Sequence, residues 1–355
     1  MLNIHPDFGD RAVDRSRNNT STMSAILAVC LAWAATLPGA VVQWATDADG
    51  FWHTAANWTS SPSLPGPADD VTIDRPLADI IVTHSQGTDS IKSLTCNEAL
   101  TVSGGVLSLA NASQIGGPFT VSGGTLNATT SGTGANFSGS VVFSGGTLGG
   151  VGTLTFSDLT WTGGTNSSRG GLVIGAGGTL AISGSAAKTF GMLTTQTAQL
   201  INHGTATLSD MGSIFHQAGP SGDTWANATL TNAAEGTFAI ESDAGFVRTG
   251  LFGTSAIDNA GLFKKSGGTG TSSIGWTVNN SGTVRVESGT LGISGAFNNT
   301  GTVEVQDGRT LTLSGGGTGT GNLRVGVGAT LNFSGGTHSL ATSTLTNDGT
   351  TNFSL

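Results

Sequence analysis

The sequence has little positive charge, very little cysteine and no tyrosine. Its 13 lysine and arginine residues stand against 22 aspartate and glutamate residues, and only 10% of the chain is charged. A nucleic-acid-binding protein needs a basic stripe or patch, so this balance argues against nucleic acid as a partner. Of the two cysteines, only Cys96 lies outside the predicted leader described below, and one thiol cannot form an intrachain disulfide. We therefore expect Cys96 to be a small buried hydrophobic residue.

The sequence also lacks long helical patterns. Beyond residue 40 no long run shows a 3.6-residue hydrophobic period, and glycine, which disfavours helix, supplies 57 of the 355 residues. Disorder is excluded as well, because an apolar fraction of 37% is too high for a flexible glycine- and serine-rich linker. These absences predict an all-β protein.

The stretch 279–336 repeats itself at a short and nearly constant period. NNSGTVRVESG at 279–289 returns as NNTGTVEVQDG at 298–308, and the pattern of 308–316 returns at 328–336. A fixed period of about 20 residues is the signature of a repeat fold.

Each repeat contains two short runs in which apolar and polar residues alternate. In 302–306, Val303 and Val305 point one way and Glu304 the other, as in a strand that is buried on one face. Glycine, asparagine and aspartate between the runs suit tight turns. The runs could form hairpins or one turn of a parallel coil. Equal spacing favours the coil, since it stacks like on like: Val303 over Leu323, Leu311 over Leu331 and asparagine over asparagine.

Looser copies of the repeat extend the prediction over residues 91–355, as roughly 12–14 turns of a β-helix. The Asn-x-Gly-Thr units that begin near Asn202, Asn232 and Asn259 are spaced more widely than the clean repeats, which implies longer loops at 213–223 and 241–254. The final residues, 350–355, read as a strand with no aromatic or proline cluster to cover it. Since solenoids need terminal caps, this end is predicted to be truncated or covered by a capping partner.

Residues 1–40 resemble a secretory signal peptide. The apolar core at 25–37 is followed by a small-residue exit at 37–40, and its length is short for a membrane span. The alternative is a membrane anchor that extends to Val42. The positive region is supplied by Arg11, Arg15 and Arg17.

Residues 41–90 are rich in tryptophan and proline and are predicted to form an N-terminal cap with the first turns. An open solenoid end would expose unpaired backbone, which bulky aromatic residues can cover. The alternative is a binding platform for sugar rings. Residues 47–50 resemble the start of a calcium loop, but the remaining ligands do not follow at that spacing. The three candidate ligand residues are Trp44, Trp52 and Trp58.

The repeat units and the opening of the chain resemble those of bacterial haemagglutinin-like and autotransporter-passenger surface proteins. This resemblance covers about residues 44–355. It implies a right-handed single-stranded parallel β-helix outside the cell, and it implies no activity, because such repeats are scaffold. The motifs that carry it are residues 259–268, NNSGTV at 279–284, NNTGTV at 298–303, WHTAANW at 52–58 and PGPADD at 65–70.

No residue pattern predicts catalysis, a cofactor or a metal. The signs of Arg285, Glu304 and Arg324 alternate on outward positions, which predicts a charge ladder between turns. Lys264 and Lys265 read as a solvated turn. No two histidines have metal-ligand spacing, and the six are scattered at positions 5, 53, 84, 203, 216 and 338.

Two functions remain open. The first is a non-catalytic secreted or cell-surface protein, associated with the outer membrane and serving as a structural stalk or an adhesin-like scaffold for an extracellular glycan or a host or matrix surface. The second is a polysaccharide-binding or polysaccharide-degrading lyase or hydrolase that uses the tryptophan-rich start or the 213–254 loops.

Overall fold

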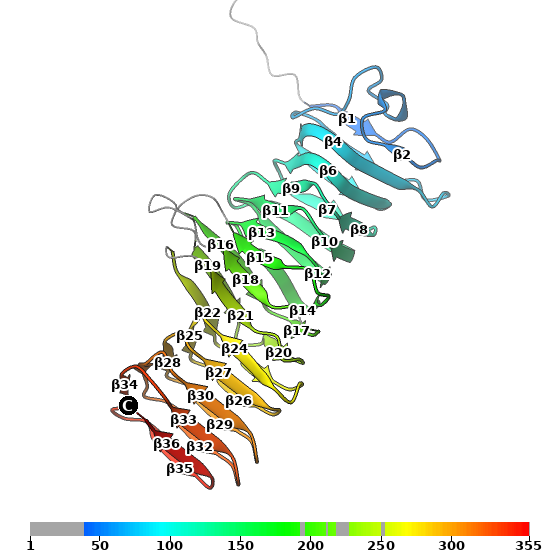
Figure 1. Cartoon of the computed structure of the whole chain (residues 1–355). Helices are drawn as coiled ribbons and strands as arrows, with labels where there is room; N and C mark the ends of the chain where they lie inside the picture. Colours follow the sequence, from blue (N-terminus) through cyan, green and yellow to red (C-terminus); the bar gives the residue numbers. More distant parts are fainter. Residues whose placement is uncertain (1–38, 192–195, 211, 218–226, 250–252, 355) are drawn as a thin grey trace, which may run out of the picture. The chain divides into compact units, whose positions relative to one another are not determined.

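Short parallel strands coil into a β-solenoid of about 13 turns, as the sequence predicts (Figure 1). The computed structural model describes residues 39–191, 196–210, 212–217, 227–249 and 253–354. The predicted leader therefore lies outside the described residues, apart from its last two positions. Among the described residues, no helix combines the length and the apolar character needed to cross a bilayer.

Parallel pairing runs along three faces of the coil. Face 1 consists of β1 (Val41–Gln43), β3 (Asp70–Ile73), β5 (Ser93–Cys96), β7 (Ser113–Ile115), the first parts of β10 (Gly134–Phe143), β12 (Thr153–Trp161) and β14 (Leu172–Ile182), and β16 (Thr197–Asn202), β19 (Asn227–Asn232), β22 (Ser255–Asn259), β25 (Thr277–Asn280) and β28 (Phe297–Asn299).

Face 2 consists of β2 (Gly50–Phe51), the first parts of β4 (Ile81–Ile91) and β6 (Ala99–Leu109), β8 (Phe119–Val121), the second parts of β10, β12 and β14, and β17 (Thr205–Leu208), β20 (Thr237–Ile240), β23 (Leu262–Lys265), β26 (Thr283–Val286), β29 (Thr302–Val305), β32 (Asn322–Val325) and β35 (Thr344–Asn347).

Face 3 begins with the second parts of β4 and β6. It continues with the complete strands β9 (Thr125–Ala128), β11 (Thr147–Gly150), β13 (Gly164–Ser168), β15 (Lys188–Gly191), β18 (Ile214–Gln217), β21 (Phe246–Thr249), β24 (Thr271–Ile274), β27 (Thr290–Ile293), β30 (Thr310–Leu313), β33 (Thr330–Phe333) and β36 (Thr350–Phe353). A separate two-stranded sheet joins β31 (Gly317–Thr318) to β34 (His338–Ser339), and a short 3₁₀ helix, η1, covers Ala55–Asn57.

The predicted register is confirmed where the repeats are clean. Val303 pairs with Leu323, Leu311 pairs with Leu331, and the Asn-Asn pair of β25 pairs with that of β28. The inward residues of these strands are buried. The prediction of two strands per turn is wrong, because the Asn-Asn segments that read as turns form a third strand on face 1.

Close contact between turns explains the recurring Gly-Gly pairs. Gly146 has a positive φ of 74°, and a Cβ at this position would lie 2.1 Å from the carbonyl oxygen of Gly124 in the neighbouring turn. Only glycine fits this corner, because other residues would both strain the backbone and collide with the next turn.

A ladder of buried asparagine side chains runs along the inside of face 1. The Nδ2 of each member donates to the Oδ1 of the next at 2.7–2.8 Å. Asn259 Nδ2 also donates to the carbonyl oxygens of Gly261 and Thr283, at 3.2 and 3.0 Å. The predicted stacking of asparagines is therefore confirmed, and these polar groups are buried with partners. The members are Asn202, Asn232, Asn259, Asn280 and Asn299.

The last described turn is less well covered than the others. Phe353 stacks on Phe333 with ring centroids 4.9 Å apart, yet the exposed fraction of Phe353 is 71% and that of Leu345 is 45%. Apolar side chains are therefore open to solvent on this turn.

Replacing one member of the ladder should destabilise the coil. Asn259→Ala should lower the free energy of unfolding by about 2–3 kcal/mol, because it leaves buried polar groups of the neighbouring turns without partners. Urea unfolding followed by circular dichroism measures this change. The matched control is Asn279→Ala, which removes an outward-facing amide from β25, the strand that pairs with the strand of Asn259, and should cost less than about 1 kcal/mol. Equal costs would contradict a special role for the buried ladder.

Candidate functional site

The three candidate tryptophans form a small core at the N-terminal end of the solenoid. The ring centroids of Trp44 and Trp58 lie 5.0 Å apart and those of Trp52 and Trp58 lie 4.8 Å apart, both in edge-to-face contact. Trp58 Nε1 donates a hydrogen bond to the carbonyl oxygen of Trp52 at 2.7 Å. No more than 1% of any of the three residues is exposed. The geometry supports the predicted cap and leaves no open ring face on which a sugar could stack.

Aspartates tie the cap to the turns below it. Asp69 accepts hydrogen bonds from the backbone N–H groups of Ala40 and Gly66, at 3.1 and 2.8 Å. Asp49, from the segment that resembles a calcium loop, accepts one from the N–H of Ile81 at 2.8 Å. Asp47 from the same segment forms an ion pair with Arg75. These carboxylates therefore already have structural partners.

Asp70 links β3 to β5. Its carboxylate accepts from Lys92 Nζ at 2.6 Å and from Ser93 Oγ at 2.5 Å. The hydrogen bond from Lys92, reinforced by the one from Ser93, lowers the pKa of Asp70 below its ordinary value of 3.8.

Two histidines and a carboxylate come together beside the tryptophan core. The Nε2 atoms of His53 and His84 lie 2.8 and 2.9 Å from the same oxygen, Oδ2 of Asp89. His84 is fully buried and contacts Trp52 edge to face, with ring centroids 5.8 Å apart. The side chains of His53 and Asp89 keep exposed fractions of 18% and 12%. Among the described residues, this is the group of three side chains that could hold a metal ion.

A corner in β4 creates this cluster. In a straight strand His84 and Asp89 would lie about 16 Å apart, on opposite faces. The pairing of β4 with β6 instead shifts twice between His84 and Thr88, and Gly87 adopts a positive φ of 75° there. His53 comes from the previous turn, two residues beyond β2, whose Phe51 pairs with Thr83.

The prediction that the histidines are scattered is wrong for His53 and His84, whose ring centroids lie 5.2 Å apart. Stacking of turns joins residues that are one turn apart in sequence, and the first turns are longer than the clean repeat. The register between the first two turns would have predicted that His53 and His84 lie close together. That register cannot be read from the sequence, because the tryptophan-rich segment does not follow the repeat. His203 lies elsewhere, paired with Glu235 at 2.7 Å.

Lys265 is also placed differently from the prediction. It is buried, and its Nζ lies 2.8–3.0 Å from four acceptors, namely Asp243 Oδ1, Ser272 Oγ and the carbonyl oxygens of Ser242 and Gly267, among which its three N–H groups are shared. Lys265 therefore closes a corner of the coil from inside. Its hydrogen bond is the main cause that lowers the pKa of Asp243.

The predicted charge ladder is confirmed in register. Glu304 lies between Arg285 and Arg324 on neighbouring strands, and Arg285 Nε donates to Glu304 Oε2 at 2.6 Å. A parallel row of side chains, called the amide row below, begins at Asp258. Asn279 Nδ2 donates to Asp258 Oδ1 at 2.7 Å, and Asn298 Nδ2 donates to Asn279 Oδ1 at 2.9 Å. An open groove of about 260 Å³ follows this row.

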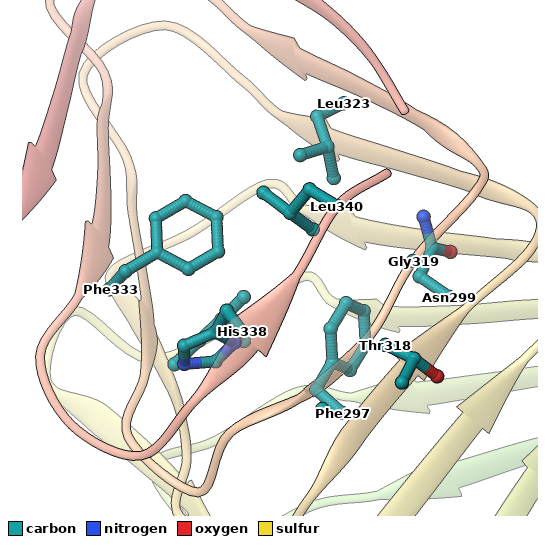
Figure 2. A pocket seen from close by; sticks show the side chains of 10 residues that line it. Phe297, Asn299, Thr318, Gly319, Leu323, Phe333, His338 and Leu340 are labelled. Atoms are coloured by element: carbon teal, nitrogen blue, oxygen red, sulfur yellow. The ribbon is translucent and has the colours of Figure 1, made fainter. Parts of the chain in front are cut away.

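A second pocket is too small for a sugar. Figure 2 shows Phe297, Phe333, His338 and Leu340 gathered around it near the last turns. Its volume of about 10 Å³ matches roughly one water molecule. The predicted long loops at 213–223 and 241–254 contain strands β18 and β21 of face 3, and residues 218–226 and 250–252 lie outside the described residues.

The fold defines the class of the protein, a parallel β-solenoid with a tryptophan-packed N-terminal cap. Comparisons of the chain with protein-family models, with curated proteins and with solved structures find no match.

Gly87 should be required for the cluster to form. A Cβ at this position would lie 2.6 Å from His53 Nε2, in addition to the strain of a positive φ. Gly132 is a matched control, since its φ is 79° and a Cβ there would meet nothing within 4 Å. Gly132→Ala should cost about 1 kcal/mol of unfolding free energy from strain alone, and Gly87→Ala should cost more. Equal losses in urea unfolding would show that His53 does not lie against Gly87.

Acid should weaken the Asp70 link. Because the pKa of Asp70 is lowered by folding, its contribution is fully present above the unfolded value near 3.8 and is lost as the pH falls through the folded value. The difference in urea midpoint between wild type and Asp70→Asn should therefore shrink as the pH drops below 4. Lys92→Met removes the main cause of the lowered pKa of Asp70, so the stability of this variant should also depend less on pH in the same range. A difference that stays constant with pH would contradict the assignment.

Proposed function

We propose that this chain is a non-catalytic β-solenoid scaffold that works outside the cell, as a structural stalk or an adhesin-like surface protein. One observation carries the proposal: the outward polar side chains of the regular turns bond from turn to turn, as in the rows of Asn279 and Arg285, instead of converging on a reacting centre. Such rows stiffen a scaffold, since each turn is stabilised mainly by its neighbours.

The support for an extracellular location comes from the sequence. The predicted leader at 1–40 and the polar, lysine-poor composition support export, and the resemblance to passenger repeats supports display at a bacterial surface. The partner that suits this role is an extracellular glycan or a host or matrix surface. The exposed apolar side chains of the last described turn suit a capping partner.

Cell fractionation of the native gene product, with its intact mass, tests the proposal. We expect the protein at the cell surface or in the medium, shortened by roughly 40 residues. The control is a leader-deleted version of the same gene, which should remain inside the cell. An uncleaved intracellular product of the full gene would overturn the extracellular role.

A second candidate is polysaccharide binding along the amide row. The groove beside Asn279 and Asn298 is long enough to follow several turns, and amides are suited to hydrogen bonds with sugar hydroxyls. Asp258 is the one carboxylate among its lining residues, whereas glycoside hydrolysis usually needs two, so this groove suits binding rather than cleavage. Binding on a glycan array that is lost in Asn298→Ala, but kept in Asn332→Ala, would favour this candidate.

A further inference from the structure

We propose that His53, His84 and Asp89 bind one divalent transition-metal ion of the Zn²⁺ type, which fastens the N-terminal cap to the turn that follows it. This inference is independent of the extracellular role, because it rests on the geometry of the three side chains.

The three ligand atoms already converge. One ligand atom from each of His53, His84 and Asp89 lies within 4.8 Å of the other two, and the Nε2 atoms of both histidines lie within 2.9 Å of Asp89 Oδ2. Ligand atoms on one tetrahedral Zn²⁺ lie about 3.3 Å apart, given metal–ligand distances of about 2.0–2.2 Å. The two imidazole nitrogens lie no more than 4.8 Å apart, so each would have to move by at most roughly 0.8 Å to place all three ligand atoms around one ion.

The second nitrogen of His84 is held as in a metal-binding histidine. His84 Nδ1 lies 2.9 Å from the carbonyl oxygen of Gly104, in the next turn. A carbonyl oxygen only accepts, so Nδ1 carries the hydrogen. If Nε2 also donated to Asp89, this fully buried ring would carry a positive charge. A metal ion instead takes the Nε2 lone pair of the neutral ring, and the Nδ1–H to carbonyl bond is the usual outer contact of such a ligand.

The ligand types select the ion. Two imidazole nitrogens and one carboxylate oxygen suit Zn²⁺ and its neighbours in the first transition row. Calcium and magnesium prefer oxygen ligands throughout, so they fit this set poorly. Three protein ligands leave one tetrahedral position, and the partial exposure of His53 and Asp89 lets water reach it from the surface.

The position of the site gives it a structural effect. His53 belongs to the first turn, His84 and Asp89 to the second, and the Gly104 carbonyl to the third. His84 also packs against Trp52 of the cap core. An ion at this corner would hold the cap to two successive turns, and would stabilise the folded end by mass action because the unfolded chain lacks the site.

Zinc titration of the full chain tests the site. The protein, produced without a histidine tag and stripped with a chelator, is titrated with zinc chloride by calorimetry, and the bound metal is counted by native mass spectrometry. We expect one Zn²⁺ per chain, a higher unfolding temperature with zinc, and no competition from calcium. His53→Gln and Asp89→Asn should each weaken binding by at least about tenfold, since loss of an outer contact alone costs roughly 10–100-fold.

His203→Gln is the matched control. It removes a different histidine–carboxylate pair, His203 with Glu235, and should leave the stoichiometry and affinity unchanged. If the wild-type chain binds no zinc, or if His53→Gln and Asp89→Asn bind as tightly as wild type, the proposal is overturned and the cluster is a hydrogen-bonded triad. If both variants lose their β-sheet signal, cobalt substitution of the wild type decides. A four-coordinate visible absorption band supports the site, and its absence overturns it.

Discussion

In-register bonding between successive turns is the constraint on which the rest of the structure depends. Each strand of the coil pairs through its backbone with the strands of the neighbouring turns, so a slip by one residue would turn every inward side chain outward. The buried asparagine ladder, which includes Asn259 and Asn280, resists such a slip because a misplaced amide would leave polar groups buried without partners. Backbone pairing alone would tolerate the slip more easily, since it is the same at every residue.

This constraint explains how much of the fold follows from the sequence. Where the period is constant, like residues stack on like, so the pairing of Val303 with Leu323 follows directly from the spacing. The third strand of each turn was missed because Asn-Asn segments have the composition of a turn, although the second asparagine points inward and bonds to its neighbours. Propensity describes a residue alone, whereas here the neighbouring turn decides its conformation.

The N-terminal cap and the histidine cluster beside it differ in how far the sequence predicts them. The cap was predictable, because a cluster of tryptophans and prolines before a repeat array has few other uses than to cover its end. The cluster of His53, His84 and Asp89 was not, because it needs a corner within β4 and a first turn of irregular length. Burial of Lys265 was hidden for a similar reason: its partners come from other turns and from the following corner. In this solenoid the regular turns can therefore be predicted from the sequence, whereas the side-chain clusters at its irregular turns cannot.

Distance measurement between two spin labels tests the stacking most directly. Lys264, Arg285, Glu304, Arg324 and Thr346 follow one another in register on face 2. Labels on Lys264→Cys and Thr346→Cys, in a chain whose native cysteines are replaced, should lie four strand spacings apart, with backbones about 19 Å from each other. A narrow distribution consistent with that separation is the predicted result. A broad distribution centred at roughly 50 Å, as for an unordered segment of this length, would contradict the account.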